Sequence, residues 1–510
     1  MSRRRWAIGI LVAWVVGLGV LVRREFFRTT AARLADAALS VPPGAVYYRV
    51  DAGAQQIGYV SSTVDTLKDT ITVADVLVLD VPALGVLHRT TARSTTRLSR
   101  ALRLLDVDAT YEEDRHLGRA HARMVRDSVL ALTVVSGPDS QETQFHLDRS
   151  FVLPSLLPLR LAFGGDLKKG STYRVRVFDP AMLTLRDVGV SVAAETTLAT
   201  PDSAEYDSTA MAWTPVHLDT VRAFRIETSA DGEATRMWID GEGRIVRQEF
   251  AQGLTLSRTS YELAAENFRH RDTARIARAS LDPPAGAIVP VTAAAAGIPF
   301  GPPLATLRVR FSGAPAAAFA LAGDGQTLSG DTVVIRRAVP ESLTPGFRLP
   351  TRDTAFAADL RAEPLIPAGD ARLMFPLIRI IQMERDPVKV AALLTHWVAG
   401  RVRPSADAAL PSALLAIASG RGDASGATAL YVALARSAGL PARAAAGVVY
   451  LRGRFYYHAW PEVWLGRWVP VDPVADQFPA DAAHLRLSVG TLARRAELVR
   501  RLGTLKLEAP

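Results

Sequence analysis

The feature that most constrains the fold is a long stretch, about residues 44–265, that is patterned for β-strands. Runs such as "AVYYRVDAGAQQIGYVSSTVDT" and "TYRVRVFDP" alternate apolar with polar residues or are rich in β-branched residues over strand lengths. Asp231-Gly232 and Asp240-Gly241 fall between such runs, as expected for the tight turns of a meander. We predict a large antiparallel sheet with one buried face; a curved sheet that holds an apolar ligand is the alternative.

The N-terminal 28 residues predict a membrane anchor. The apolar run from Trp6 to Val22 is 17 residues long and lies between two arginine clusters, so as a helix it would measure about 25 Å, near the lower limit for spanning a bilayer. A cleaved signal peptide is the alternative. It is less favoured because the nearest small-residue site, near Ala37, lies well beyond the apolar run, and because Arg23 and Arg24 stand where a cleavage region is usually small and neutral. The expected localisation is a single-pass membrane protein with a cytoplasmic tip and the bulk of the chain extracytoplasmic.

Composition excludes several classes of function. The chain of 510 residues has a formal net charge of +9, but its arginines are spread along the sequence, so we expect no nucleic-acid partner. Cysteine is absent, which excludes disulfides, thiolate metal sites and thiol catalysis together. We predict no metal site and no cofactor.

Four parts follow the anchor, and they define an expected α+β fold class. After the β-rich domain, proline, glycine and alanine without periodicity mark a linker. A short strand-patterned segment predicts a small β domain. The spacing of Val390, Leu393, Leu394 and Trp397 then predicts a helix near the start of the last domain. The predicted boundaries are 1–28, 44–265, 266–303, 304–365 and 370–505.

The stretch "RGDASGATALYVALARSAGLPAR" in the last domain predicts a loop that enters a helix. Residues 424–438 are rich in helix formers, and Gly439 followed by Pro441 is a stop signal. Asp423 or Ser425 can cap the helix. A side chain at such an N-terminus lies at the positive end of the helix dipole, where a cysteine becomes a thiolate and an oxyanion can be held. The inert residue Ala424 occupies this position.

The stretch "YYHAWPEVWLGRWVPVDP" predicts a β-hairpin. With residues 465–467 as a three-residue loop, Trp464 faces Trp468 and Trp460 faces Asp472. His458 is then a diagonal neighbour of Asp472 on the same face. An aspartate in that position fixes the tautomer of the histidine and stabilises its charged form.

These residues carry a family resemblance. The segments "GDASGATALYVALARSAGLPARAAAGVVY", "FYYHAWPEVWLGRWVPVDP" and "FPADAAHLRL" resemble the core of the transglutaminase-like superfamily over about residues 410–490. The resemblance implies a papain-like fold in which a cysteine at a helix start, a histidine on a strand and an aspartate on the next strand form a triad. His458 matches the triad histidine, Asp472 the aspartate, and Gly422-Asp423 the dipeptide before the nucleophile. The position of the nucleophile itself is Ala424.

The resemblance implies a vestigial triad rather than a working one. We predict that catalysis is lost and that the cleft, with Asp423, Ser425 and Trp460, binds a peptide or protein partner at the cell envelope. An active acyl transferase or peptidase that uses Ser425 or an unrecognised nucleophile is the alternative. One helical step turns Ser425 by about 100° away from His458, which disfavours it. A structural envelope protein with an unused cleft is the third possibility.

Overall fold

The computed structural model describes residues 41–510 except for short stretches. The predicted anchor at residues 1–28 and the alternative cleavage site near Ala37 therefore lie outside the described residues. The stretches not described within residues 41–510 are 68, 84, 114–115, 127, 137–138, 148–150, 165–166, 180–183, 231–232, 251–252, 281–286, 290–296, 364, 405–410, 491–497, 499–504 and 510.

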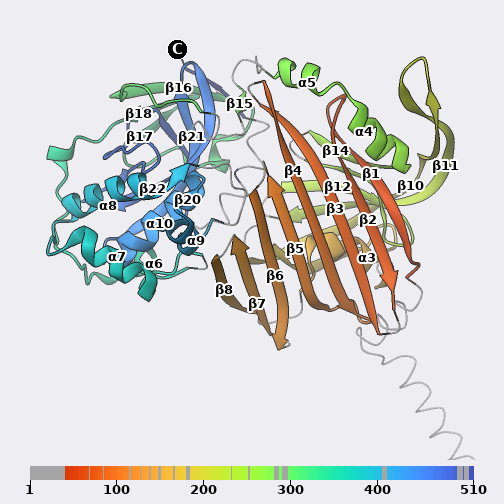
Figure 1. Ribbon diagram of the computed structural model, residues 1–510, viewed down its shortest axis with the longest axis horizontal. Helices are drawn as coiled ribbons and strands as arrows, with labels where there is room; N and C mark the ends of the chain where they lie inside the picture. Colours follow the sequence, from red (N-terminus) through yellow and green to blue (C-terminus); the bar gives the residue numbers. More distant parts are fainter. Residues whose placement is uncertain are drawn as a thin grey trace, which may run out of the picture.

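A single 14-stranded antiparallel sheet dominates the N-terminal lobe (Figure 1). Its order is β8-β7-β6-β5-β4-β3-β2-β1-β14-β13-β12-β11-β10-β9, so most neighbours in the sheet are also neighbours in sequence. Such a meander follows from alternating strands joined by short turns. The strands are β1 Gly44–Ala52, β2 Gln55–Thr66, β3 Thr70–Ala83, β4 Val86–Ser99, β5 Leu104–Glu113, β6 His116–Arg126, β7 Val129–Ser136, β8 Asp139–His146, β9 Thr172–Asp179, β10 Thr184–Asp207, β11 Ala212–Ala230, β12 Glu233–Ile239, β13 Ile245–Glu249 and β14 Leu254–Thr259.

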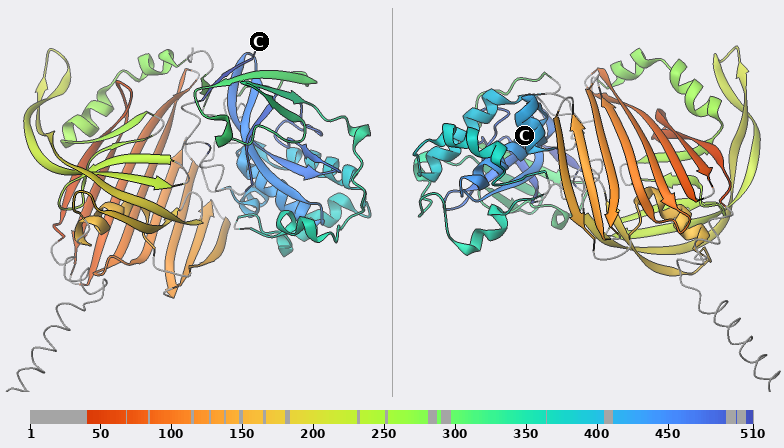
Figure 2. Two further views of the ribbon diagram at one scale, coloured as in Figure 1. Left: turned by 180° about the vertical axis from the view of Figure 1, so that it is seen from behind. Right: turned by 60° about the horizontal axis from the view of Figure 1, so that its bottom comes forward.

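The sheet curls so that its two ends approach each other. Strands β8 and β9 are consecutive in sequence yet lie at opposite ends of the strand order. In the left view of Figure 2, the later strands (yellow to green) cross in front of the earlier ones (orange). Phe145 of β8 packs edge-on against Phe178 of β9, with ring centroids 5.8 Å apart. The helix between them, α3 (Leu157–Phe163), buries Leu159 in the same apolar core as Phe178. The accumulated twist of a long sheet produces such curling, and it buries one face against itself.

Short helices follow the last strand of this sheet. A π-helical turn, η3 (Glu262–Glu266), continues into α4 (Asn267–His270), and Asp272 then caps α5 (Thr273–Ala279) through the N–H of Arg275. Arg271, beside the cap, forms an ion pair with Asp80 of β3. These contacts hold the end of the predicted β-rich domain against the sheet.

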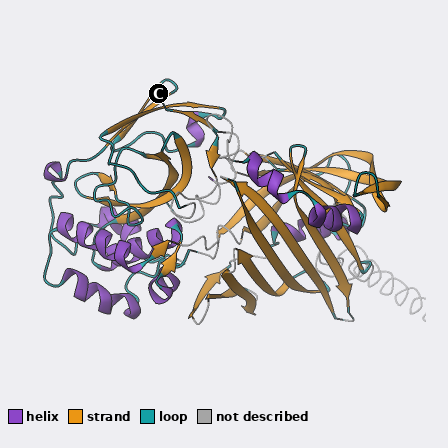
Figure 3. Ribbon diagram, turned by 45° about the horizontal axis from the view of Figure 1, so that its top comes forward, coloured by secondary structure: helices purple, strands orange, loops and turns teal. Residues whose placement is uncertain are grey.

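Longer helices gather in the C-terminal lobe (Figure 3). They are α7 (Ala371–Ile381), α8 (Pro387–Arg401), α9 (Ala413–Ser419) and α10 (Ala424–Ser437), preceded by the short α6 (Ala357–Leu360). A five-stranded sheet packs beside them in the order β15-β22-β21-β24, with β23 paired to β22. Its strands are β15 Ile288–Val289, β21 Ala442–Leu451, β22 Arg454–Trp464, β23 Trp468–Pro470 and β24 His484–Val489.

Helix α10 is the centre of this lobe. Almost all of its residues are buried, which fits a helix that is apolar all round. The Tyr431 hydroxyl donates to the carbonyl of Ala391 in α8 at 3.0 Å. As predicted, the helix ends before Gly439, whose φ of 76° is left-handed, and a Cβ there would lie 2.3 Å from Pro350. The N-terminus of α10 is thereby held at a fixed place in the core.

A small four-stranded sheet completes the C-terminal lobe. Its order is β17-β18-β16-β25, so the last strand of the chain pairs with a strand nearly two hundred residues earlier. The strands are β16 Thr306–Ser312, β17 Gln326–Ser329, β18 Thr332–Arg336 and β25 Lys506–Glu508. One apolar core joins Val309 of this sheet with Ala424 of α10 and Leu485 of β24.

The two lobes meet where α9 covers the edge strand β8. Leu415 of α9 packs against Leu132 and Val134 of β7, and the Ser412 hydroxyl donates to the side-chain oxygen of Gln141. Covering an edge strand removes a site where another chain could pair. A two-stranded parallel pair, β19 (Arg403–Pro404) and β20 (Arg421–Gly422), then leads from α9 to α10.

The predicted α+β class is wrong. Strands make up most of the described regular structure, and the largest unit is the 14-stranded sheet. The prediction gave the helical C-terminal domain too much weight, because that lobe itself carries two sheets around a few helices. Among the described residues, no helix combines the length and apolar character needed to cross a membrane.

Candidate functional site: a buried histidine–aspartate–histidine network

The N-terminus of α10 carries the position of the missing nucleophile. Of the two predicted caps, Asp423 is the one used: its carboxylate accepts from the N–H of Gly426 at 2.7 Å. Ala424 is the first helical residue and is 3% exposed. One turn later, the Thr428 hydroxyl donates to the carbonyl of Ala424 at 2.7 Å. Asp423 therefore caps one N–H of the first turn, but no reactive side chain stands at this position.

The hairpin brings His458 to Asp472. Trp464 pairs with Trp468, as the three-residue loop predicts. Strand β23 ends at Pro470, so Asp472 lies just beyond it in an isolated bridge with Gln477. His458 Nε2 is 3.0 Å from Asp472 Oδ2, and both side chains are fully buried.

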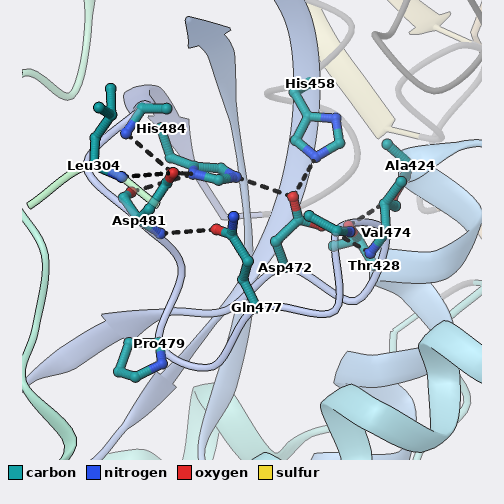
Figure 4. A network of polar contacts seen from close by, with 12 residues as sticks. Leu304, Ala424, Thr428, His458, Asp472, Val474, Gln477, Pro479, Asp481 and His484 are labelled. Carbon is teal, nitrogen blue, oxygen red and sulfur yellow. Dashed lines mark hydrogen bonds and ion pairs between the residues drawn. The ribbon is translucent and has the colours of Figure 1, made fainter. Parts of the chain in front are cut away.

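A second histidine, which the sequence analysis did not assign, completes the network (Figure 4). His484 begins β24, and its Nε2 is also 3.0 Å from Asp472 Oδ2. Its Nδ1 is 2.9 Å from Asp481 Oδ1. The spacing of Asp481 and His484, three residues apart in a segment already matched to the family, was the available signal.

Charge explains why both histidines converge on one oxygen. The other oxygen, Asp472 Oδ1, accepts from the N–H groups of Val474 at 2.7 Å and Ala475 at 3.2 Å. Burial alone would raise the pKa of Asp472, but the attraction of His458 and the hydrogen bonds from both histidines hold it well below its usual range. Burial would lower the pKa of His484, yet its bonds to Asp472 and Asp481 raise it to about 9. At neutral pH, Asp472 is thus a carboxylate and His484 an imidazolium.

These three side chains are also the group among the described residues that comes nearest to a metal-ligand set. One donor atom from each of His458, Asp472 and His484 lies within 4.8 Å of the others. However, Asp472 Oδ2 accepts from both imidazoles, and His484 also contacts Asp481 through its second nitrogen. Both nitrogens of His484 therefore carry protons, which leaves no lone pair for a metal. We interpret the group as a hydrogen-bonded network.

Aromatic side chains close the site. Trp460 is 1% exposed and lies parallel to His458, with ring centroids 6.1 Å apart and an interplanar angle of 26°. It meets His484 edge-on at 5.2 Å. Phe300, from the segment interpreted as a linker, lies 5.9 Å from the His458 ring. Nearby, β15 of the same segment pairs in parallel with β22. Side chains, rather than an open cleft, surround the three polar residues.

Two polar atoms in this enclosure lack a partner among the described residues. They are His458 Nδ1 and Trp460 Nε1. Trp460 also lines a cavity of about 20 Å³ together with Asp481 and His484, a volume close to that of a single water site. The alternative nucleophile, Ser425, is 9% exposed and has no hydrogen bond to His458 in the part of the chain that is described.

Comparison with known proteins identifies the class of this lobe. Residues 378–473 match the family model of the transglutaminase-like superfamily. The match begins in α7 and ends just after Asp472, so it includes Ala424 and His458 but not His484. The C-terminal lobe therefore contains a transglutaminase-like domain, and since the chain has no cysteine, this domain lacks the cysteine nucleophile.

Other comparisons add little. The sequence matches no curated protein. A solved structure described as a "putative cysteine protease" from Cytophaga hutchinsonii shares 13% identity, with a TM-score of 0.28, over 40% of this chain and 84% of its own. A protein of the DUF1089 family from Pseudomonas aeruginosa shares 9% identity, with a TM-score of 0.23, over 38% of this chain and 90% of its own.

Proposed function

We propose that this chain is a membrane-anchored, catalytically inactive transglutaminase-like protein that binds a peptide or protein partner at the cell envelope. The observation that carries the proposal is Ala424, which stands at the start of α10 in place of a nucleophile while the His458–Asp472 pair remains intact. A methyl group cannot attack a carboxamide carbon, so no acyl-enzyme can form.

Retention of the polar network favours a role for the domain over simple decay. Buried ions cost free energy unless they are paired and fully hydrogen-bonded. Asp472 has four such bonds here, from two histidines and two backbone N–H groups. The network joins β22, β24 and the loop after β23, so it holds the shape of the binding domain without catalysing a reaction.

Binding would occur beside the hairpin. By resemblance, a papain-like domain binds extended chains along the cleft between the helix start and the hairpin. In this structure Phe300 packs against the ring of His458 on that hairpin, so we expect a partner segment that reaches His458 to displace it. The membrane anchor rests on the apolar run Trp6 to Val22 and its flanking arginines.

Enzyme assays test the loss of catalysis. The purified full-length chain should incorporate no fluorescent amine into a glutamine-rich protein and should cleave no peptide. Measurable turnover that disappears in Ser425→Ala would contradict the proposal and establish serine catalysis instead.

Cell fractionation tests the anchor. The full-length chain should sediment with membranes and resist extraction by salt, whereas a chain that lacks residues 1–28 should be soluble. A soluble full-length chain, or a mature N-terminus near Ala38, would rule out the anchor.

A peptide array tests partner binding. Because Phe300 covers His458, Phe300→Ala should increase the binding of extended peptides. Phe356→Ala is the matched control, since Phe356 packs 5.3 Å from Trp464 at the other end of β22. Equal binding by both variants would argue against a cleft beneath Phe300.

A further inference from the structure

One imidazole nitrogen at the centre of the site has no hydrogen-bond partner within the described part of the chain. His458 is completely buried, and its Nε2 contacts Asp472. Its Nδ1 has no hydrogen-bond partner among the described residues. Buried polar atoms are nearly always hydrogen-bonded, so a buried nitrogen without a partner at this position suggests that a ligand binds to it. In Figure 4 this nitrogen lies on the side of the ring that faces Ala424.

The start of α10 is complementary to an anion. The helix has 14 residues and a buried first turn, so its unpaired N–H groups and dipole give that end a partial positive charge. Asp423 already takes the N–H of Gly426. For the N–H groups of Ala424 and Ser425, the described residues provide no acceptor.

We propose that a small monovalent anion, a halide or one carboxylate group, binds between Ala424 and Nδ1 of His458. Alanine is shorter than cysteine by one sulfur atom, so such an anion takes the place of the missing thiolate. The anion accepts a hydrogen bond from the N–H at Nδ1 of His458 on one side and from the first-turn N–H groups of α10 on the other. Binding forms no covalent bond.

The surrounding charges allow this anion. Asp472 lies on the opposite side of the imidazole, but His484 already balances its charge through a hydrogen bond. Asp481 is likewise paired with His484. Among the carboxylates of the described residues, Asp423 also lies at the start of α10, and it accepts from the Gly426 N–H at the cap. Doubly charged sulfate or phosphate is disfavoured, because His484 is already paired with Asp472 and Asp481, which leaves His458 as the one imidazole of the described network that can face the anion.

This inference is independent of the proposed partner binding. The same chemistry fits a free ion and the acidic side chain or C-terminus of a peptide. If the anion is a carboxylate of a peptide, the domain binds an acidic group at this position. A relative with a cysteine thiolate there would instead attack a carboxamide.

Anomalous diffraction from crystals soaked in sodium bromide tests the site directly. A bromide peak is expected between Ala424 Cβ and His458 Nδ1. The peak should be lost in His458→Gln and in Ala424→Ser, whose neutral hydroxyl fills the same place. It should remain in His396→Gln, because His396 is exposed and pairs with Asp476 outside the site. Absence of the peak in the unmodified protein, or its survival in Ala424→Ser, would overturn the proposal.

Solution measurements separate the two sources of the anion. At constant ionic strength, bromide and formate should raise the melting temperature with a saturating dependence, whereas sulfate should not. A glutamate-containing peptide should compete with bromide if the peptide is the source, and the matched glutamine peptide should not. Competition by neither peptide assigns the site to a free ion. If His458→Gln fails to fold, the Ala424→Ser variant serves as the test. A rise in its melting temperature with bromide would contradict the proposed site.

Discussion

The two halves of the candidate site differ in whether they keep their polar residues. The half built on β22 and β24 keeps His458, Asp472 and His484 fully buried and joined through a single carboxylate oxygen. The half at the start of α10 has Ala424 where its family resemblance calls for a nucleophile. Both halves are equally well packed, since Ala424 is only 3% exposed. The difference lies in chemistry and not in order.

The contrast teaches which residues the fold itself needs. Removing a charged member of a buried network leaves another charge without compensation, which costs several kcal/mol. Replacing a first-turn cysteine by alanine leaves no charge unpaired, because Asp423 supplies the helix cap. We therefore expect the fold to tolerate an alanine at position 424 but not the loss of a charged member of the network.

The largest effect is expected from Asp472→Asn. The change leaves His484 with an uncompensated charge on one side, so the C-terminal lobe should lose about 3–5 kcal/mol of stability. Urea unfolding followed by tryptophan fluorescence measures this loss. Asp476→Asn is the control, since its partner His396 is 84% exposed and the pair should contribute less than about 1 kcal/mol. Equal losses for both variants would break the comparison.

Stability should next fall as pH rises. The pKa of His484 is raised to about 9 in the folded protein from an ordinary value of 6.5. Its contribution is fully present below pH 6.5 and is lost as pH rises towards 9, by up to about 3 kcal/mol. Asp472 acts in the opposite direction: its lowered pKa stabilises the fold above about pH 4, and this is lost at more acidic pH. Urea midpoints from pH 6 to 10 should show the alkaline loss, and His484→Gln should flatten it.

A thiol introduced at Ala424 tests the electrostatic environment at the start of α10. In Ala424→Cys, the helix N-terminus and His458 should lower the thiol pKa below the free value of about 8.5. Thiolate absorbance near 240 nm measures this without any reagent entering the site. Alkylation by iodoacetamide should nevertheless be slow, because position 424 is only 3% exposed. Ala427→Cys is the matched control, equally buried but beyond the first turn. An ordinary thiol pKa at position 424 would show that the helix N-terminus and His458 no longer stabilise a negative charge there.

The smallest effect is expected from Ser425→Ala. Its side chain has no hydrogen bond to His458 among the described residues, so stability should change by less than about 0.5 kcal/mol. Assays for amine incorporation should give the same zero rate before and after the change. A measurable rate that falls in Ser425→Ala would show that catalysis occurs at the start of α10, contrary to the proposal.

Local patterns predicted much of the secondary structure but not its assembly. Alternating runs in residues 44–265 coincide with strands, and the periodicity around Val390 lies within α8. The single continuous sheet and its curl depend on twist accumulated over many strands, which no short window of sequence contains. The pairing of β16 with β25 joins segments too distant in sequence for any local rule.

The candidate site was predictable where its residues lie close in sequence. The hairpin register placed His458 beside Asp472, since both flank one short loop. His484 was not assigned, because its position depends on β24 pairing with β21 across the sheet. Phe300 was also missed, since its segment has the composition of a linker and no periodicity.

The pairing of β25 with β16 also affects how the protein is made. Leu307 and Leu507 share one apolar core that includes Ala424 and Leu485. During synthesis, that core cannot close until the last strand has left the ribosome, whereas the strands of the N-terminal sheet can pair in the order in which they emerge. A nascent chain that stops short of β25 would therefore have a complete first lobe and an open core in the second, which exposes apolar side chains to quality-control proteases.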